Sequence, residues 1–511
     1  MNRRDFLRIS AVAAATPAII AAVKKTELDE ASIADLQAAM AIGRESSVSL
    51  TKKYLHRIEQ IDRGGPTLNS VIELNPDALQ IARDLDRERK SGRSRGPLHG
   101  IPILIKDNID TRDRMRTSAG SLALADSIAS RDSVVAKRLR AAGAVILGKT
   151  NLSEWANFRG DRSTSGWSGR GGLTKNPYAL DRNPSGSSAG SGVAVSANLC
   201  AAAIGTETDG SIVSPSTVCG IVGLKPTVGL ISRMGIIPIS HSQDTAGPMT
   251  RSVRDAAVLL GALAEDDKAH ADYTKFLRPD GLRGARLGFA KRYQRSGASA
   301  KIIENAVEAM KKAGAIIVEP FDDALLAKAG SSEGDVLSYE FKAGINAYLA
   351  GLDPKVPART LEDLIAFNEK HHDKELRYFG QETFIRAQSK GPLTDKAYLE
   401  ALEKCKKLAR EEGIDALVEK HQLDAIVAFT GGPAAKTDLV NGDRGLGGSS
   451  TPAAVAGYPS ITVPAGDVFA LPVGISFFGP AWSEPTLLRL AYAFELITQA
   501  RKAPRFLPTV G

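Results

Sequence analysis

Apolar side chains follow two patterns along the chain, one typical of helices and the other of buried strands. In one segment they recur at the spacing of a single helix face, at Leu50, Tyr54, Ile58 and Ile61. Residues 101–105 instead form an uninterrupted apolar run, which is typical of a strand buried on both faces. The chain is therefore expected to contain both amphipathic helices and fully buried strands.

Helical and strand patterns also alternate, and this alternation predicts the fold class. Residues 133–142 have the pattern of a helix, and residues 144–147 that of a short buried strand. Asn75 and Pro76 supply an N-cap and a first helical residue, so we expect a further helix to begin there. Such alternation is typical of an α/β protein whose sheet is covered by helices on both faces. With 511 residues, 43% of them hydrophobic, the chain can bury a large core.

A lysine and two glycine-embedded serines carry the clearest chemistry. Lys106 ends the apolar run, and serines follow in residues 186–190 (GSSAG) and 205–211 (GTETDGS). A serine hydroxyl needs a neighbouring base to act as a nucleophile, and a lysine can be that base only when burial or a nearby cation keeps it neutral. The apolar run would desolvate the amine, whereas Asp107 and Asp110 would oppose this. The pattern indicates a hydrolase whose base is an amine.

Longer motifs accompany these residues and cover almost the whole chain after its N-terminal segment. They are residues 97–102 (PLHGIP), 148–155 (GKTNLSEW), 219–227 (CGIVGLKPT) and 456–466 (AGYPSITVPAG). Together with Lys106 and the serine motifs, they resemble the amidase signature family. Within that family the chain is most similar to bacterial peptide amidases, through residues 154–160 (EWANFRG), 206–211 (TETDGS) and 378–382 (YFGQE).

The resemblance implies a catalytic triad for amide hydrolysis through an acyl-enzyme, with no cofactor. Lys106 would be the base, Ser187 a proton shuttle after a cis Gly186–Ser187 peptide bond, and Ser211 the nucleophile. Four consecutive backbone N–H groups would form the oxyanion hole, those of Thr208, Asp209, Gly210 and Ser211. Asp209 stands where many members of the family have glycine.

The resemblance also implies one large α/β domain at residues 24–511, with a mixed central sheet covered by helices. Residues 325–420 are polar, helix-like and outside the catalytic motifs. We expect them to form a helical cap that shapes substrate access. No strong linker and no repeat interrupts the sequence.

The residues after Ser211 bear on the substrate. Family members that act on carboxylate-bearing amides place an arginine two or three residues after the nucleophile, where this chain has Val213 and Ser214. A buried carboxylate without a guanidinium partner would cost several kcal/mol. We therefore expect uncharged substrates, and the peptide amidase motifs favour C-terminal amides of peptides. The alternative is that Arg159 or Arg162 reaches the pocket.

Other amide chemistries stay open beside this one. The chain could be the glutaminase-type subunit of an amidotransferase, which would need partner subunits, or an aryl-acylamidase or general amidase. The partner expected for the leading hypothesis is a small-molecule or peptide amide, and the sequence gives no oligomeric state.

Two motifs suggest other functions. Residues 143–150 (GAVILGKT) match a phosphate-binding loop, but the four residues between the glycines are apolar and have the pattern of a strand. Residues 186–190 match the nucleophile elbow of α/β-hydrolases with Ser188 at its centre, but residues 179–185 before them are typical of a turn instead of a strand. Nucleotide binding and an esterase built on Ser188 are thus disfavoured.

Histidine and cysteine offer no better site. His99 and His241 lie near the motifs, and each fits a packed or capping role as well as a catalytic one. Cys200, Cys219 and Cys405 are isolated, and His371 and His372 lie in a charged, helix-like run. The sequence therefore predicts no metal site.

The net charge of +8 does not by itself indicate a nucleic-acid partner. Basic residues alternate with acidic ones, as in residues 83–90 (RDLDRERK), which is usual for a solvated helix face. Aromatic residues make up only 5% of the chain, so nucleic-acid binding is disfavoured.

Residues 1–23 have the features of a Tat-type signal peptide. Arg3 and Arg4 precede an apolar segment at residues 11–23, which is shorter than the roughly 20 residues that span a bilayer. We expect a bacterial protein that is periplasmic or secreted after Tat export, without stable membrane insertion.

Overall fold

The computed structural model describes residues 28–265, 272–294, 297–444 and 447–510. Residues 28–30 form a turn in a short N-terminal unit, and residues 32–511 form one compact unit, which carries all the elements discussed below. The proposed signal peptide at residues 1–23 lies outside the described residues.

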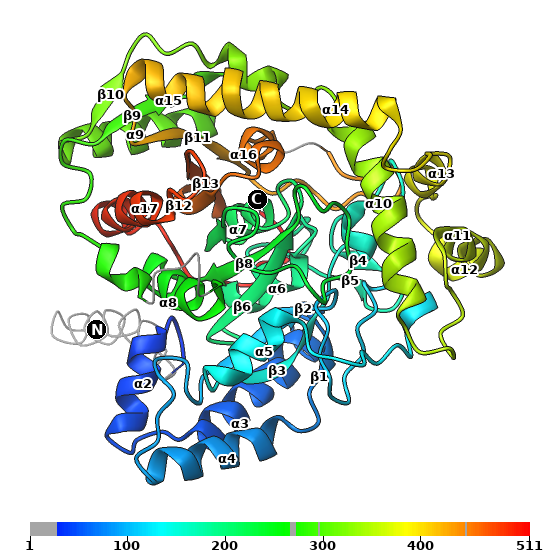
Figure 1. The fold of residues 1–511 in the computed structure, drawn as a ribbon. Coiled ribbons are helices and arrows are strands. Elements are labelled where there is room, and N and C mark those ends of the chain that lie inside the picture. The colour runs from blue at the N-terminus through cyan, green and yellow to red at the C-terminus, as the bar shows by residue number, and fades with distance from the viewer. Residues whose placement is uncertain (1–27, 266–271, 295–296, 445–446, 511) are drawn as a thin grey trace, which may run out of the picture. The chain divides into compact units, whose positions relative to one another are not determined.

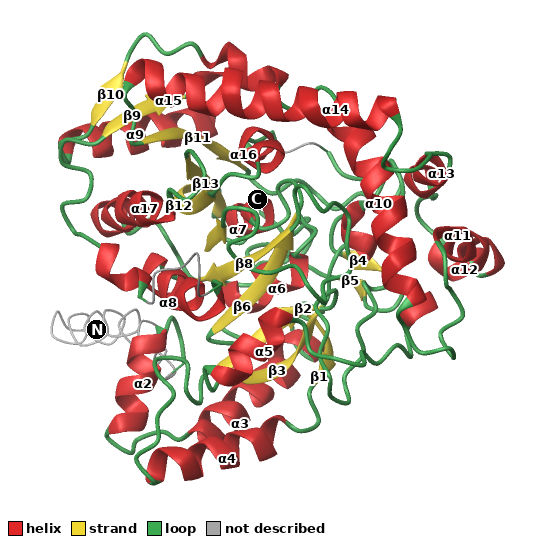
Figure 2. Ribbon diagram, in the orientation of Figure 1, coloured by secondary structure: helices red, strands yellow, loops and turns green. Residues whose placement is uncertain are grey.

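An eleven-stranded mixed sheet runs through the compact unit (Figures 1 and 2). In spatial order its strands are β1 (Val71–Leu74), β3 (Val145–Thr150), β2 (Pro102–Lys106), β6 (Ala202–Glu207), β8 (Thr245–Thr250), β7 (Val222–Lys225), β12 (Ser460–Val468), β13 (Leu471–Phe478), β11 (Ala425–Gly431), β9 (Arg286–Phe289) and β10 (Ile316–Val318). The pairs β2–β3, β2–β6, β9–β10 and β9–β11 are parallel, and the other neighbours are antiparallel. A separate two-stranded sheet consists of β4 (Trp167–Ser168) and β5 (Gly172–Leu173).

Sixteen α-helices are described. They are α2 (Ile33–Ala41), α3 (Ser47–Arg57), α4 (Ala78–Lys90), α5 (Val134–Ala141), α6 (Ala189–Ser196), α7 (Val213–Val218), α8 (Val253–Leu263), α9 (Ala298–Lys312), α10 (Glu333–Ala350), α11 (Leu361–Lys370), α12 (His372–Glu375), α13 (Glu382–Gln388), α14 (Lys396–Lys406), α15 (Asp415–His421), α16 (Ser450–Ala456) and α17 (Glu484–Thr498). Shorter turns are the π-helical η1 (Ile58–Arg63) and η7 (Lys407–Ile414) and the 3-10 turns η2 (Leu122–Leu124), η3 (Glu154–Asn157), η4 (Tyr273–Phe276), η5 (Lys291–Tyr293) and η6 (Asp323–Lys328).

Helices cover both faces of the sheet, as the alternation of patterns predicts. The connection from β2 to β3 passes through α5, and the connection from β3 to β6 passes through α6 in the opposite direction along the sheet. Because crossovers between parallel strands are right-handed in nearly all proteins, we expect α5 and α6 on opposite faces of the sheet. Helix α7 packs beside α6, while α8 and α17 continue the layer of α5.

The predicted elements form close to their expected bounds. Ser133 caps α5 with its hydroxyl, which accepts from the Ala136 N–H at 3.0 Å. The helix expected at Asn75 begins two residues later, after Asp77. The Asn75 side chain accepts from the Asp77 N–H at 2.9 Å, so it closes the turn before the helix and does not cap the helix itself.

Residues 325–420 hold α10 to α15, drawn largely in yellow in Figure 1. Part of this region packs on the core through an apolar cluster in which the Phe384 ring lies 5.7 Å from Trp155 and 5.3 Å from Phe341. The cluster joins α10 and α13 to η3, the turn that follows β3 by a few residues.

A buried ion cluster makes a second connection between these regions. Arg159 pairs with Glu154 and lies 3.6 Å from Glu375 of α12, and all three side chains have no exposed surface. The guanidinium also stacks on the Phe379 ring, 4.0 Å from its centroid. Burial raises the pKa of Glu154 well above its usual range. Arg159 is therefore fixed inside the protein and is not available to a substrate.

Candidate active site

Three segments that are far apart in the sequence meet at one edge of the sheet. Lys106 is the last residue of β2, and Thr206 is the penultimate residue of β6. Because β2 and β6 are adjacent and parallel, their carboxyl ends lie at the same edge, the usual position of ligand sites in α/β proteins. Ser187 lies just before α6, which packs on both strands.

The Lys106 amine is completely buried and has three polar neighbours. Its Nζ lies 2.7 Å from Ser187 Oγ, 2.9 Å from Thr206 Oγ1 and 3.3 Å from the Thr206 carbonyl oxygen. Asn108 Nδ2 donates to the same Thr206 hydroxyl at 3.0 Å. Lysine and serine of the predicted triad are thus in direct contact.

The three oxygens around Nζ can accept from a protonated lysine, and they can also hold a neutral one. A neutral lysine has two N–H donors and one lone pair, whereas a protonated one has three donors and no acceptor. Thr206 supplies two acceptors, its carbonyl oxygen and its hydroxyl oxygen. When the two N–H groups point to these acceptors, the lone pair faces the Ser187 hydroxyl. In that arrangement Ser187 can give its proton to Lys106.

Burial is the dominant electrostatic effect on this amine. Desolvation lowers the pKa of Lys106 to about 7, and the carboxylates of Asp244 and Glu207 oppose it. The opposing acids differ from those expected from the sequence, Asp107 and Asp110.

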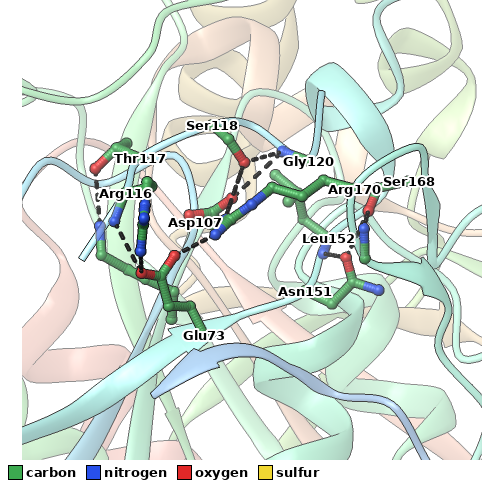
Figure 3. Close-up of polar contacts among 12 residues, drawn as sticks. Glu73, Asp107, Arg116, Thr117, Ser118, Gly120, Asn151, Leu152, Ser168 and Arg170 are labelled. Atoms are coloured by element: carbon green, nitrogen blue, oxygen red, sulfur yellow. Dashed lines mark hydrogen bonds and ion pairs between the residues drawn. The ribbon is translucent and has the colours of Figure 1, made fainter. Parts of the chain in front are cut away.

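Asp107 and Asp110 have partners of their own. Successive side chains of a strand point to opposite faces, so Asp107 points away from the Lys106 amine. Figure 3 shows it among Ser118, Gly120 and Arg170, with the Ser118 hydroxyl donating to its carboxylate. Asp110 accepts from the Tyr348 hydroxyl at 2.9 Å. The acids that raise the pKa of Lys106 are therefore not the ones nearest to it in the sequence.

The Gly186–Ser187 peptide bond is cis, as the resemblance implies. The Ser187 carbonyl oxygen accepts from the Ser153 N–H at 3.1 Å. A Cβ on Gly186 would collide with Ser153 Oγ, so only glycine fits at this position. Ser153, which precedes η3, therefore fixes the position of the Ser187 backbone.

Ser211 lies in the turn between β6 and α7, beside the Ser187–Ser188 segment. Its carbonyl oxygen accepts from the Ser188 N–H at 3.1 Å. Ser211 retains 8% of its exposure, whereas Ser187 and Ser188 have none. Of the three serines, Ser211 alone retains exposed surface.

The Ser188 hydroxyl is used within the protein. It donates to the Thr206 carbonyl oxygen at 3.0 Å and accepts from the Thr206 N–H at 3.2 Å. Ser188 stands at the N-cap position of α6 without a capping hydrogen bond from its side chain, and no strand leads into it, so the nucleophile-elbow alternative does not fit.

The loop before Ser211 presents a group of backbone donors. In the part of the chain that the structure describes, the N–H groups of Asp209, Gly210 and Ser211 donate to no protein acceptor. Gly210 has a φ of +77°, a backbone conformation that residues other than glycine rarely adopt. Glu207 accepts from the N–H groups of Ile212 and Val213, at 2.7 and 3.0 Å, and so fixes the start of α7. The free donors suit an anion that develops beside Ser211.

The remaining candidates have structural roles. Lys149 lies in β3 and donates to the Ile109 carbonyl oxygen at 2.5 Å and to Thr117 Oγ1 at 2.9 Å, so residues 145–150 are strand and not a phosphate-binding loop. The buried His99 lies with Nε2 2.9 Å from the Leu85 carbonyl oxygen. His241 lies 3.3 Å from Glu340 Oε1.

The described segments carry neither a cluster of metal-binding side chains nor a membrane-spanning helix. No group of three or more His, Cys, Asp or Glu side chains in them is arranged to hold a metal ion, and the three cysteines are buried and free. None of the helices described is long and apolar enough to cross a bilayer.

Sequence reasoning missed the residues that position the triad. Thr206 orients the Lys106 amine, Asn108 donates to Thr206, and Ser153 holds the Ser187 backbone. The sequence did contain a signal for Thr206, because this residue lies at the end of a strand pattern and within the glycine motif that leads to Ser211. Finding it required knowing that β2 and β6 are neighbours.

Comparisons with known proteins identify the family to which the chain belongs. The sequence profile of the Amidase family matches residues 49–488. The crystal structure of native peptide amidase from Stenotrophomonas maltophilia is 52% identical, with a TM-score of 0.87, over 93% of this chain and 99% of that one. A probable amidase of Arabidopsis thaliana is 42% identical over 94% of this chain and 92% of its own length. A putative amidase of Schizosaccharomyces pombe is 37% identical over 94% of this chain and 87% of its own.

These relatives correct one expectation from the sequence. The prediction of a protein that is periplasmic or secreted after Tat export in a bacterium is wrong by this comparison, because these curated relatives come from a plant and a fungus. The paired arginines that suggested export lie outside the described residues.

The fold expectation is confirmed: the sheet is mixed, helices flank it, and nearly all of the chain aligns with a solved peptide amidase. Family profile, curated relatives and solved structure agree over more than four fifths of the sequence. The chain belongs to the amidase family, whose members hydrolyse carbon–nitrogen bonds of amides.

Proposed function

We propose that this amidase removes the amide group from the C-terminus of peptides, with Ser211 as nucleophile, Ser187 as proton shuttle and Lys106 as base. The observation that carries the proposal is the buried Lys106 amine, 2.7 Å from the Ser187 hydroxyl. A fully buried lysine is costly unless it is neutral, and a neutral amine facing a serine hydroxyl is a base.

In the first step Ser211 Oγ attacks the carboxamide carbon. Its proton passes to Ser187 Oγ as the Ser187 proton passes to Lys106 Nζ, so Ser187 ends the step with one proton, as it began. The carbonyl oxygen becomes an oxyanion facing the N–H groups of Asp209, Gly210 and Ser211, with the Thr208 N–H as the fourth expected donor. Losing one such donor typically slows a reaction by a factor of about 10²–10³.

In the second step the tetrahedral intermediate collapses. The nitrogen leaves as ammonia and takes a proton from Ser187, which regains one from Lys106. An ester between the acyl group and Ser211 remains. Water then attacks that ester with the same proton path, which releases the acid and restores the Ser211 hydroxyl. Lys106 thus begins and ends each turnover neutral.

The two positions after Ser211 where an arginine would pair with a substrate carboxylate carry no charge here, which favours a neutral acyl group. Two cations, Lys436 and Arg444, line a pocket with Ser214. Val213 is buried in α7, and the Ser214 hydroxyl lies 2.8 Å from that of Ser185. Arg159 is held by Glu154 and Glu375. Arg159 and Arg162 were the two arginines considered as partners for a substrate carboxylate, and of these only Arg162 remains a candidate. The likeness to the Stenotrophomonas maltophilia peptide amidase supports a peptide amide as substrate, and residues 325–420 would shape access to it.

The assignment of the nucleophile is tested by covalent labelling. Ser211→Ala should abolish both ammonia release and labelling by a fluorophosphonate, because the attacking oxygen is lost. Peptide mapping should find the label on Ser211 of the wild-type chain. Ser187→Ala should retain a small residual rate, because a water can replace the shuttle. A label on Ser188, or full turnover by Ser211→Ala, would contradict the mechanism.

The rate should depend on pH through Lys106. Burial lowers the pKa of this amine to about 7, and only its neutral form accepts a proton. The value of kcat/KM should therefore fall tenfold per pH unit well below 7 and level off above it. Circular dichroism at each pH serves as the control for unfolding. A rate that is constant down to pH 5, or one that falls only on the alkaline side, would rule out a neutral lysine as base.

Substrate preference is tested with a matched pair of amides. A neutral peptide amide should have a kcat/KM at least about tenfold above that of the same peptide with a free carboxylate beside the scissile amide, because that carboxylate would have no guanidinium partner. Ammonia release is the measurement, with an anilide and free glutamine as further substrates. Equal or faster turnover of the acidic peptide would overturn the specificity. Turnover of glutamine or the anilide alone would identify a glutaminase-type or aryl-acylamidase activity instead.

A further inference from the structure

The loop that presents the predicted oxyanion donors is held by a side chain that the mechanism above does not use. Gln243 precedes β8 and retains only 2% of its exposure. Its Nε2 donates to the Thr208 carbonyl oxygen at 3.3 Å and to Glu333 Oε1 at 2.8 Å. One amide group therefore connects the backbone next to Ser211 with the first residue of α10.

The geometry of a peptide bond makes this contact relevant to catalysis. In a planar trans peptide, the C=O of one residue and the N–H of the next point in opposite directions. The Thr208 carbonyl and the Asp209 N–H belong to one such plane. A bond that fixes the direction of the Thr208 carbonyl therefore fixes the direction of the Asp209 N–H, one of the expected oxyanion donors.

The segment that carries Gln243 is itself attached to α10. Glu340, two helical turns after Glu333, accepts from the Ser240 hydroxyl at 2.6 Å and from the Ser242 N–H at 3.0 Å. Next to Gln243, Asp244 accepts from the Thr208 hydroxyl at 2.6 Å. Thr208 is thus held through its carbonyl oxygen and through its side chain, and the holding segment docks on one face of α10.

We propose that Gln243 and Glu333 are positioning residues of the reaction, which link helix α10 to the peptide plane that aims the Asp209 N–H at the oxyanion. The inference rests on the proposed role of Ser211. It assigns to the start of α10 an effect on the chemical step, beyond shaping access to the site.

The state of Glu333 fits this role. Burial and the neighbouring Asp209 carboxylate raise the pKa of Glu333 to about 8, so the side chain is largely protonated near neutral pH. A protonated carboxyl group keeps a carbonyl oxygen that accepts from Gln243 and adds no second negative charge beside Asp209. A glutamine at position 333 would offer the same acceptor.

The test is steady-state kinetics on a peptide amide with a small set of variants. Gln243→Ala and Glu333→Ala should each lower kcat about tenfold or more. One oxyanion donor typically raises kcat by a factor of about 10²–10³, and a misdirected donor loses part of that factor. KM should stay within about twofold, because the link acts on the transition state. The double variant should be no slower than Gln243→Ala alone, because both changes break the same link.

Two variants separate positioning from a general effect on the fold. Glu333→Gln should restore kcat to within about threefold of the wild type, because its amide oxygen accepts the same hydrogen bond. Asp335 lies on the same turn of α10 and has an exposed carboxylate that pairs with Lys390. Asp335→Ala should therefore leave kcat unchanged. If Gln243→Ala does not fold, the comparison of Glu333→Ala with Glu333→Gln decides.

Several outcomes would overturn the inference. They are an unchanged kcat in Gln243→Ala, a loss confined to KM, an additive double variant, and a Glu333→Gln variant as slow as Glu333→Ala. Fluorophosphonate labelling of the wild-type chain distinguishes these results from failure of the proposed function. If Ser211 is labelled and both Gln243→Ala and Glu333→Ala behave like the wild type, the positioning role alone is wrong. If Ser211 is not labelled, the proposed function itself fails.

Discussion

The contact between the buried Lys106 amine and the Ser187 hydroxyl is the interaction on which the rest of the site depends. Water around the amine would keep it protonated, and a protonated lysine cannot accept the serine proton. The fold therefore has to exclude water from Nζ and still supply acceptors for its hydrogens. Thr206 supplies both acceptors, from the strand next to the one that carries Lys106. Burial of the lysine and its pairing with Thr206 are consequences of one parallel strand pair.

The same edge of the sheet organises the other half of the reaction. The chain that leaves β6 turns at once into the loop with three free N–H groups and then into α7. Glu207 fixes the start of α7, and Gln243 links the loop to α10. The proposed base therefore belongs to the central sheet, while the proposed oxyanion donors are held between that sheet and the helical region. Such a division allows the helical region to influence the chemistry without contacting the reacting atoms.

Local patterns predicted much of this architecture. The apolar run before Lys106 and the glycines around the serines predicted the strand and the turns that carry the proposed triad, and residues 143–150 were recognised as a strand despite their phosphate-loop pattern. The neighbours of Lys106 could not be predicted in the same way. Asp107 is adjacent to Lys106 in the sequence but points to the opposite face. Asp244 lies far along the chain, yet its carboxylate raises the pKa of Lys106 and so opposes the effect of burial. Strand order decides which acids matter, and no local pattern specifies that order.

The central claim is that Lys106 is neutral when the enzyme works. The direct measurement is an NMR titration of protein labelled with 13Cε-lysine, in which the Lys106 signal is assigned by its loss in Lys106→Met. We expect a titration midpoint near pH 7 for Lys106, a midpoint near 8 for the buried Lys225, and midpoints of about 10.4 for the exposed lysines. A Lys106 signal that titrates together with the exposed lysines would contradict it, because the amine would then be protonated at neutral pH and could not be the base.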